Sequence, residues 1–238
     1  SRYTRRIAGE PATNIITSRG CPARCVFCQQ ESLWGDGLRL MTPGRVLAEI
    51  DAIRETTGIR NLLFLDDSLT ACSSSRMRDL CAGLLKRRVK WRGWTRANLI
   101  CRPEHLDLLR TMRKSGFVSC CVGGEAGTDR MLKALRKGTS VMQNRAALRN
   151  LRAAGILARC SIMVGIPGET WDDVAALVEF VAAERPDDWI LSSLVPLPGT
   201  PSWDEAEAMG IAIDREAVAS RGYADVFVVG GDETSGTF

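Results

Sequence analysis

The chain has 238 residues, 45% of them hydrophobic and 25% charged, with a formal net charge of +4. This is close to the globular average and allows a sizeable core. No run approaches the roughly 20 apolar residues of a membrane span, and no secretory signal pattern opens the sequence, so we expect a cytoplasmic protein without a membrane partner. The basic residues are spread along the chain, which gives no strong nucleic-acid signal.

Short apolar runs alternate with longer amphipathic segments along the whole chain. A first strand is predicted at residues 14–17. A helix should start at Thr42 and Pro43, a favourable N-cap and first helical residue, and end at Gly58. Further strands are predicted at residues 62–65, 91–97, 117–122, around 162–164 and at 189–195. Further helices are predicted at residues 76–88, 103–116, 129–154 with a break at 138, and 171–185.

Strands that alternate with helices predict βαβ units and a parallel sheet. Six units are too few for a closed eight-stranded barrel. We therefore predict an α/β fold: an open, partial (βα)6 TIM-like barrel with the helices outside. The expected parts are an N-terminal arm (1–11), the core (12–200), and a C-terminal helix and tail (201–238). The apolar run at 226–229 could be an edge strand or a frayed end.

Three cysteines, Cys21, Cys25 and Cys28, follow the first strand with the spacing C-x3-C-x2-C. That position is the catalytic edge of a parallel barrel. Thiolates of this kind select an iron–sulfur cluster or zinc. A structural zinc normally takes four protein ligands, and the single histidine, His105, is far along the chain. Three ligands on a four-iron cluster leave one iron open. A structural zinc or Fe–S binding module remains the alternative.

The cysteine spacing, with aromatic Phe27 before the last cysteine, resembles the radical S-adenosylmethionine (SAM) superfamily. The resemblance implies that Cys21, Cys25 and Cys28 hold a [4Fe–4S] cluster whose open iron binds SAM. Reductive cleavage of SAM would then give a 5′-deoxyadenosyl radical for hydrogen abstraction or methyl-type transfer. It also implies an electron donor such as flavodoxin or ferredoxin, and a small-molecule or peptide substrate that the sequence does not identify.

Four polar residues match further positions of the family between residues 14 and 199. Asp66 and Asp67 follow the second strand, where the family contacts the methionyl amino group; an Asp there could instead cap a turn or helix. Glu125 ends the fourth strand and by resemblance contacts the ribose or the amino group. Lys137 matches a contact to the SAM carboxylate, although lysine is also common at helix ends.

The fifth strand and its exit resemble the family's adenosine pocket, because residues 165–169 read Gly-Ile-Pro-Gly-Glu. Ser161 and Arg159 share one face if the strand alternates. Ser161 could bond a ribose hydroxyl, and Arg159 needs an anionic partner such as Glu125 or SAM itself. The sixth strand's exit would close the pocket on the adenine. The predicted SAM contacts are Phe27, Asp66, Asp67, Glu125, Lys137, Arg159, Ser161, Gly165, Val195 and Leu197.

These motifs, together with Arg96 and a Pro-Gly-Thr run at 198–200, look closest to the core of cobalamin-binding radical SAM proteins. Those proteins carry a separate cobalamin domain with an Asp-x-His-x-x-Gly signature, which this sequence lacks. Cobalamin is therefore expected only if a separate domain or chain supplies it.

Overall fold

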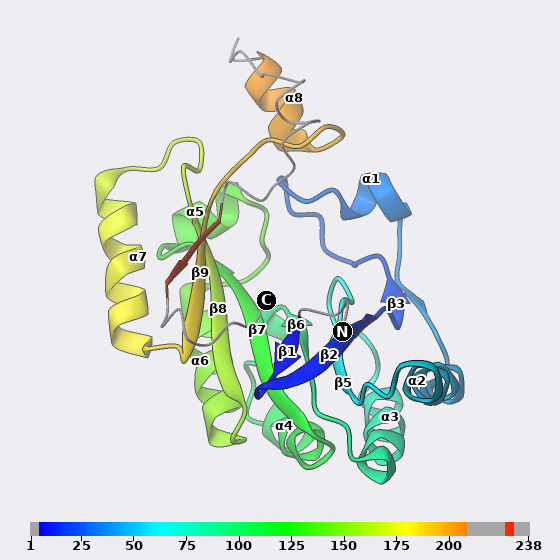
Figure 1. The fold of residues 1–238 in the computed structure, drawn as a ribbon. Helices are drawn as coiled ribbons and strands as arrows, with labels where there is room; N and C mark the ends of the chain where they lie inside the picture. The colour runs from blue at the N-terminus through cyan, green and yellow to red at the C-terminus, as the bar shows by residue number, and fades with distance from the viewer. Residues whose placement is uncertain (1–4, 209–226, 231–238) are drawn as a thin grey trace.

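The computed structural model describes residues 5–208 and 227–230. Its centre is a curved sheet with the strand order β1-β2-β5-β6-β7-β8-β9-β10 (Figure 1). The inner six strands pair in parallel: β2 (Glu10–Ile15), β5 (Asn61–Phe64), β6 (Trp91–Thr95), β7 (Phe117–Glu125), β8 (Leu157–Val164) and β9 (Asp188–Ser193). The edge strands β1 (Arg6–Ile7) and β10 (Phe227–Gly230) are antiparallel to their neighbours.

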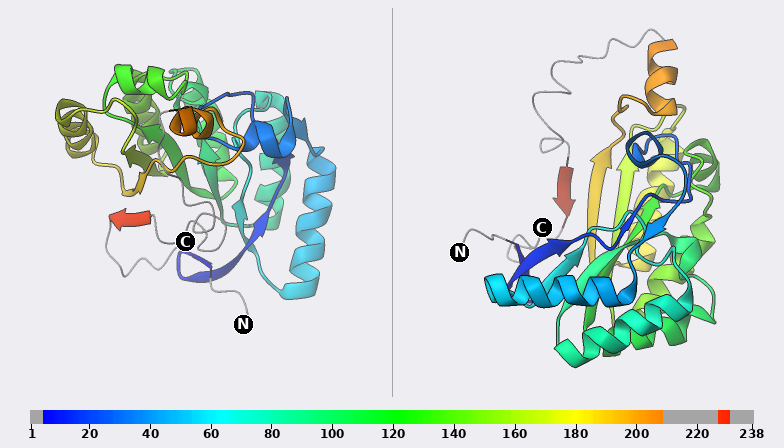
Figure 2. Two further views of the ribbon diagram at one scale, coloured as in Figure 1. Left: turned by 90° about the horizontal axis from the view of Figure 1, so that it is seen from above. Right: turned by 90° about the vertical axis from the view of Figure 1, so that its right-hand side faces the viewer.

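The longer helices cover the convex face of this sheet (Figure 2). They are α2 (Pro43–Thr57), α3 (Ser74–Arg87), α4 (His105–Lys114), α6 (Val141–Ala153) and α7 (Trp171–Glu184). Shorter elements lie toward the carboxyl ends of the strands (Figure 1): α1 (Gln30–Trp34), α5 (Asp129–Ala134) and α8 (Pro201–Ala208). The expectation of an open, partial (βα)6 barrel with helices outside is confirmed.

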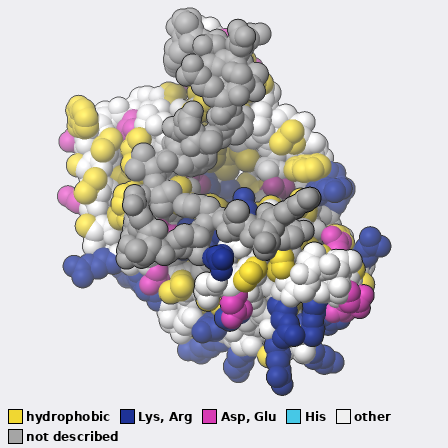
Figure 3. Space-filling model, viewed as in Figure 1, with side chains coloured by type: hydrophobic (Ala, Val, Ile, Leu, Met, Phe, Trp, Pro, Cys, Tyr) yellow, Lys and Arg dark blue, Asp and Glu magenta, His cyan; other side chains and the backbone are white. Residues whose placement is uncertain are grey.

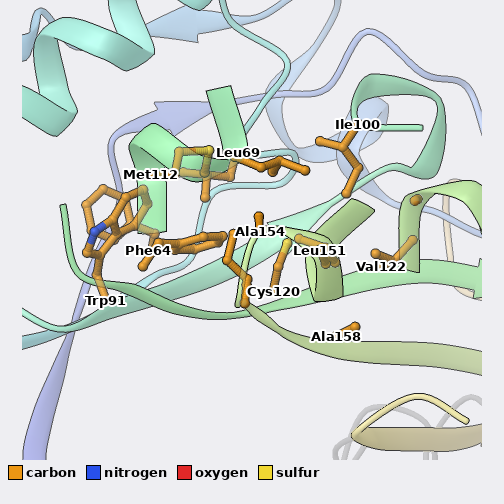
Figure 4. Close-up of a cluster of buried hydrophobic side chains, with 14 of the residues drawn as sticks. Phe64, Leu69, Trp91, Ile100, Met112, Cys120, Val122, Leu151, Ala154 and Ala158 are labelled. Atoms are coloured by element: carbon orange, nitrogen blue, oxygen red, sulfur yellow. The ribbon is translucent and has the colours of Figure 1, made fainter. Parts of the chain in front are cut away.

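The main core lies between the sheet and the helices (Figure 4). Three aromatic rings from neighbouring strands pack against one another in it at tilted angles: the centre of the Trp91 ring is 4.9 Å from that of Phe64 and 4.3 Å from that of Phe117. The buried Trp91 indole donates to the carbonyl of Ser115 at 3.2 Å, which satisfies its polar atom. Because alternate residues of a strand point to opposite faces, the neighbours of these aromatic residues face the concave side.

Most of the helix starts, stops and breaks that the sequence predicts are present in the structure. Thr42 caps α2 by accepting from the backbone N–H of Arg45 at 3.3 Å, and Gly58 ends the helix in the left-handed conformation (φ 71°). The predicted helical region at 129–154 breaks at Gly138 (φ 66°) into α5 and α6. The run near residue 228 is the edge strand β10. Of the described helices, none is long and apolar enough to cross a membrane.

The structure differs from the sequence-based expectations near the N-terminus. The first parallel strand spans Glu10–Ile15 instead of 14–17, because the chain leaves the sheet after residue 15. Residues 6 and 7, expected in an arm, form β1 and pair with residues 11 and 10 of β2. Two short strands, β3 (Ser18–Arg19) and β4 (Arg39–Leu40), and the helix α1 were not predicted; they enclose the cysteine segment.

Candidate active site

The three cysteines lie on one loop at the carboxyl edge of the sheet, between β3 and α1 (Figure 1). We call residues 20–29 the cysteine loop. Cys25 is buried, and Cys21 and Cys28 are half-buried. Burial raises the pKa of the Cys28 thiol, and the neighbouring Cys25 and Cys21 raise it further. Among the described residues, no three His, Cys, Asp or Glu side chains converge as a single metal ion would require.

Asp66 and Asp67, which follow β5, hold the start of this loop. The Asp66 carboxylate accepts from the backbone N–H and hydroxyl of Thr17, both at 2.6 Å, and from the N–H of Ser18 at 2.7 Å. Asp67 accepts from the N–H of Gly20 at 2.9 Å. Asp66 therefore has the turn-fixing role that the sequence left open, and it is only 3% exposed. Its predicted contact with SAM stays a prediction.

The half-buried Asp67 has a second neighbour that the sequence analysis missed, Gln30 of α1. Burial raises the pKa of Asp67, while hydrogen bonds from Gly20 and from the Gln30 side chain oppose that rise. The Oε1 atom of Gln30 is buried and has no hydrogen-bond partner among the described residues. The Asp67 carboxylate and the Oε1 atom of Gln30 are thus two hydrogen-bond acceptors that lie side by side. In the sequence, the only sign of a role for Gln30 is its position two residues after Cys28.

Two cationic side chains lie beside the cysteine loop. Arg96 donates from Nη1 to the Sγ atom of Cys25 at 3.2 Å and also donates to the carbonyl of Lys137. The Nζ atom of Lys137 lies 5.8 Å from the centre of the Phe27 ring and lowers the pKa of Cys28. The sequence analysis used Arg96 only as part of a family pattern; its contact with a cysteine 71 residues away appears only in the fold.

Glu125, at the end of β7, pairs with Lys137 through an Oε1–Nζ contact of 2.5 Å. Both side chains are 7% exposed, and Glu125 adopts a positive φ of 60°. Gly123 makes room for the pair, because a Cβ atom at that position would lie within 2.6 Å of both side chains. The structure therefore brings Glu125, Lys137, Phe27 and the cysteine loop together. Contact of these residues with SAM stays a prediction.

Arg159 of β8 has a different partner from the one expected. Its Nε and Nη2 atoms contact Oδ2 of Asp188 at 2.7 and 2.5 Å, so the anionic partner that the sequence requires is Asp188, which was not among the examples named, Glu125 and SAM. The reason is register: Arg159 lies opposite Asp188 at the start of β9, whereas Glu125 pairs with Ile162. Arg159 as a SAM contact stays a prediction.

The other predicted adenosine contacts lie nearer the carboxyl edge. Ser161 is half-buried on β8, and Gly165 follows the strand with φ 76° and donates to Oε2 of Glu169 at 2.7 Å. Val195 and Leu197 are half-buried on the segment that leaves β9. No hydrogen bond described for these residues reaches the cysteine loop, so their contact with SAM also stays a prediction.

Two cavities adjoin the cysteine loop. One, of about 480 Å³, is lined by Cys25, Cys28 and Arg136. The second, of about 380 Å³, is lined by Val26 and by residues from the exits of β8 and β9, including Ile166 and Leu194. Arg136 lines both cavities. The predicted adenosine segments therefore lie next to the cysteine loop, as a shared cofactor site requires.

Two relatives show what the chain is similar to. An uncharacterized methyltransferase of Pyrococcus horikoshii is 28% identical over 86% of this chain and 44% of its own length. The anaerobic magnesium-protoporphyrin IX monomethyl ester cyclase of Cereibacter sphaeroides is 30% identical over 79% of this chain and 31% of its own length. The chain thus spans less than half the length of these relatives.

The fold has a similar counterpart among solved structures. The radical SAM methyltransferase TsrM of Kitasatospora setae, solved with cobalamin and a [4Fe–4S] cluster bound, superposes with a TM-score of 0.72 at 22% identity, over 84% of this chain and 40% of that one. In addition, the family model of the radical SAM superfamily matches residues 15–181, from the end of β2 to the last turn of α7. This match covers most of the chain, which therefore belongs to the radical SAM superfamily.

Proposed function

We propose that this chain is the catalytic core of a radical SAM enzyme, with a [4Fe–4S] cluster on Cys21, Cys25 and Cys28 and SAM beside it. The observation that carries the proposal is the cysteine loop itself: three neighbouring thiols, fixed by Asp66 and Asp67 at the edge of the sheet where parallel barrels place their active sites.

The donor set fits a four-iron cluster better than a single zinc ion. Zinc gathers its ligands at about 2.3 Å around one point, whereas each thiolate of a cluster binds a different iron. The cysteine loop supplies three thiols, from Cys21, Cys25 and Cys28, whereas a structural zinc site normally takes four protein ligands. Arg96 and Lys137 would offset the negative charge of the thiolates, which favours the ionised form that binds metal.

When bound, the cluster would supply one electron to the SAM sulfonium, giving methionine and a 5′-deoxyadenosyl radical for hydrogen abstraction or methyl-type transfer. The protein's own residues bind, orient and shield these groups. Asp67 and Gln30 would accept from the ammonium of SAM, and Lys137 would donate to its carboxylate. Glu125 would keep Lys137 in place and accept from the ribose hydroxyls.

The remaining contacts would form the adenosine end. Ser161 would bond a ribose hydroxyl, while Gly165, Val195 and Leu197 would line the adenine side next to the apolar cavity that Ile166 and Leu194 enclose. Phe27 would lie between the cluster and Lys137. The geometry makes Arg159 a poorer candidate than the other predicted contacts, because Asp188 already engages two of its nitrogen atoms.

The rest of the reaction would depend on groups outside this chain. A flavodoxin or ferredoxin would supply the electron. Several relatives are methyltransferases, and one solved relative binds cobalamin. Cobalamin would come from a separate domain or chain, and methyl transfer would then be the expected outcome.

Anaerobic reconstitution with iron and sulfide tests the proposal. The chain should bind four irons and four sulfides and release 5′-deoxyadenosine from SAM with dithionite. Cys25→Ala should lose both properties, whereas Cys101→Ala, at a half-buried cysteine outside the loop, should keep them. Zinc without sulfide would favour the zinc module, and a complete cluster without SAM cleavage would favour a binding module. Either result contradicts the proposal.

A further inference from the structure

The turns that precede three neighbouring strands lie side by side at the amino edge of the sheet, the edge opposite the cysteine loop. They join α2 to β5, α3 to β6 and α4 to β7. Backbone hydrogen bonds connect them: the N–H of Leu62 donates to the carbonyl of Lys90 at 2.9 Å, and the N–H of Trp91 donates to the carbonyl of Gly116 at 3.0 Å. The exposed side chains of the three turns therefore belong to one surface.

This surface carries basic residues and no acidic ones. We call the following residues the basic edge: 58–61, 85–90 and 113–116. They include seven basic residues and no aspartate or glutamate: Arg60, Lys86, Arg87, Arg88, Lys90, Arg113 and Lys114. Arg87 pairs with Asp51 and Lys90 with Glu10, whereas the other five are exposed and form no ion pair with the residues that the structure describes. In the space-filling view, basic side chains gather at the lower edge of the molecule, over the ends of α3 and α4 (Figure 3).

The helix dipoles explain only part of this charge. A cation near the C-terminus of a helix interacts favourably with its dipole, which accounts for Lys86 and Lys114. The dipole does not account for Arg88, which ends α3 in the left-handed conformation with φ 52°. The residues in that conformation after α2, α4 and α6 are all glycines: Gly58, Gly116 and Gly155. Arg185 takes the same conformation after α7, but acidic residues follow it at 187 and 188. An arginine in place of glycine has a conformational cost, which an anion bound to its side chain offsets.

Two exposed leucines lie among these cations. Leu85 of α3 is 54% exposed, and its carbonyl accepts from the N–H of Arg88 at 3.2 Å. Leu157, the first residue of β8, is 55% exposed. Two residues before it, the carbonyl of Gly155 accepts from Nε of Arg113 at 2.7 Å. The surface thus combines cations with large aliphatic side chains that face solvent.

This combination suits an anionic membrane surface better than a nucleic acid. Lysine and arginine attract anionic headgroups, and exposed aliphatic side chains can enter the boundary between the headgroups and the acyl chains. Nucleic acids also bind cations, but single strands are usually held by aromatic side chains that stack on the bases. The basic edge contains no aromatic residue, and the rings of Trp91 and Phe117, which begin the adjoining strands, are fully buried.

We propose that the basic edge binds to the surface of a membrane that contains anionic lipids, with Leu85 and Leu157 inserted among the headgroups. Such a contact needs no membrane-spanning segment. It was not expected from the sequence, because the cations are far apart along the chain and only the fold gathers them. β7 crosses the sheet in nine residues, so the two edges are about 26 Å apart. The cysteine loop stays away from the membrane, and the contact does not depend on the proposed function.

Cosedimentation with lipid vesicles tests this inference. The chain should bind vesicles made of equal amounts of phosphatidylcholine and phosphatidylglycerol, and should bind pure phosphatidylcholine vesicles much more weakly. Raising the ionic strength from about 0.1 M to about 1 M shortens the screening length from about 10 Å to about 3 Å, so most of the bound protein should be released. Equal binding to the two kinds of vesicle would overturn the inference.

Two variants that each remove one charge test whether the basic edge is the surface that binds. Arg88→Gly places glycine at a positive φ, so it should fold at least as stably as the unmodified chain. Arg88→Gly and Lys114→Gln should each lower the partition coefficient about fivefold, the contribution expected of one cation near an anionic surface. The matched control is Lys133→Gln, at an exposed residue of α5, and it should leave binding unchanged. Unchanged binding in the double variant of Arg88 and Lys114 would contradict the proposal.

Leu157→Ser distinguishes a membrane from other polyanions. It removes an apolar side chain and leaves every charge in place, so it should weaken binding to the mixed vesicles. Vesicle binding that is unaffected by Leu157→Ser would rule out insertion of this leucine. An oligouridylate is then added as a competitor, and release of the chain from the vesicles at an equal phosphate concentration would assign the surface to nucleic acid instead. All these measurements use the cluster-free chain, so a failure of SAM cleavage leaves their outcome unchanged.

Discussion

Glu125 and Glu184 are both buried glutamates with cationic partners, but their surroundings differ. Glu184, at the end of α7, meets three arginines, Arg145, Arg149 and Arg152, whose side chains are between 34% and 65% exposed. Glu125, at the carboxyl edge of the sheet, has one lysine that is itself 7% exposed, and a positive φ. The first network joins α6 and α7 with cations that remain hydrated. The second keeps two charges out of water at a strained position, as binding sites often do.

Replacing the lysine of the site pair should have the largest effect on folding. Lys137→Met leaves Glu125 buried without its cation, so the free energy of unfolding should fall by about 3–5 kcal/mol. Lys137→Arg keeps the positive charge, so the free energy of unfolding should fall much less in this variant. Urea denaturation of the cluster-free chain, followed by circular dichroism, measures both. A loss below about 1 kcal/mol for Lys137→Met would show that Glu125 is not dependent on this lysine.

Breaking the ion-pair network of Glu184 in the helical layer should lower the free energy of unfolding by less than Lys137→Met does. Glu184→Gln should lower the free energy of unfolding by about 1–3 kcal/mol, because the exposed arginines can rehydrate. Burial raises the pKa of Glu184, but the hydrogen bonds from Arg149 and Arg145 outweigh it and the net pKa is lowered. Its contribution should be complete above the unfolded pKa of about 4.3 and be lost as the pH falls through the lower folded value.

The same denaturation series in Glu184→Gln should therefore show a smaller acid sensitivity than the unmodified chain. SAM affinity of the reconstituted variant should not change, because Glu184 lies in the helical layer. An altered SAM affinity would mean that the two networks are coupled.

Asp67→Asn should show the opposite pattern, a small effect on folding and a clear one on binding. Burial raises the pKa of Asp67, so its ionised form opposes folding, and this penalty appears as the pH rises through the acidic range toward the folded pKa. The variant should be unchanged or up to about 1 kcal/mol more stable at neutral pH. SAM affinity, measured by calorimetry on the reconstituted chain, should fall about tenfold.

Equal SAM affinity in Asp67→Asn and the unmodified chain would remove Asp67 from the site. Ser75→Ala, at an exposed residue of α3, is a matched control that should change neither property. If SAM affinity falls in Asp67→Asn and does not change in Glu184→Gln, Asp67 is an acid retained for binding and Glu184 is one retained for stability.

Arg96→Gln should have the smallest effect on stability, under about 1 kcal/mol, because Arg96 is only half-buried. Its contact with the Cys25 sulfur should instead be visible in the cluster, whose reduction potential depends on hydrogen bonds to sulfur. Loss of this donor should move the potential to a more negative value, measured by redox titration with electron paramagnetic resonance. Arg110→Gln provides the control, and an unmoved potential in Arg96→Gln would show that the contact does not act on the cluster.

Local features of the fold could be read from the sequence alone. The cap at Thr42, the stop at Gly58 and the break at Gly138 depend on residues a few positions apart, as do the alternating strands and helices. The spacing of Cys21, Cys25 and Cys28 is also local, and it was enough to indicate the family that the comparisons show. The short strands that flank the cysteine loop, β3 and β4, have no such signal, because two-residue strands leave no periodicity.

The partners of the charged residues were decided only by the tertiary structure. Arg159 was expected to need an anionic partner such as Glu125 or SAM, and strand register places Asp188 opposite it, while Glu125 pairs with Lys137. Likewise, the contact between Arg96 and Cys25 joins residues 71 positions apart. Sequence by itself determined the longer strands and helices and the spacing of the thiols, because those depend on short-range periodicity and spacing. Which side chains meet at the carboxyl edge depends on register and burial, and these exist only once the sheet has formed.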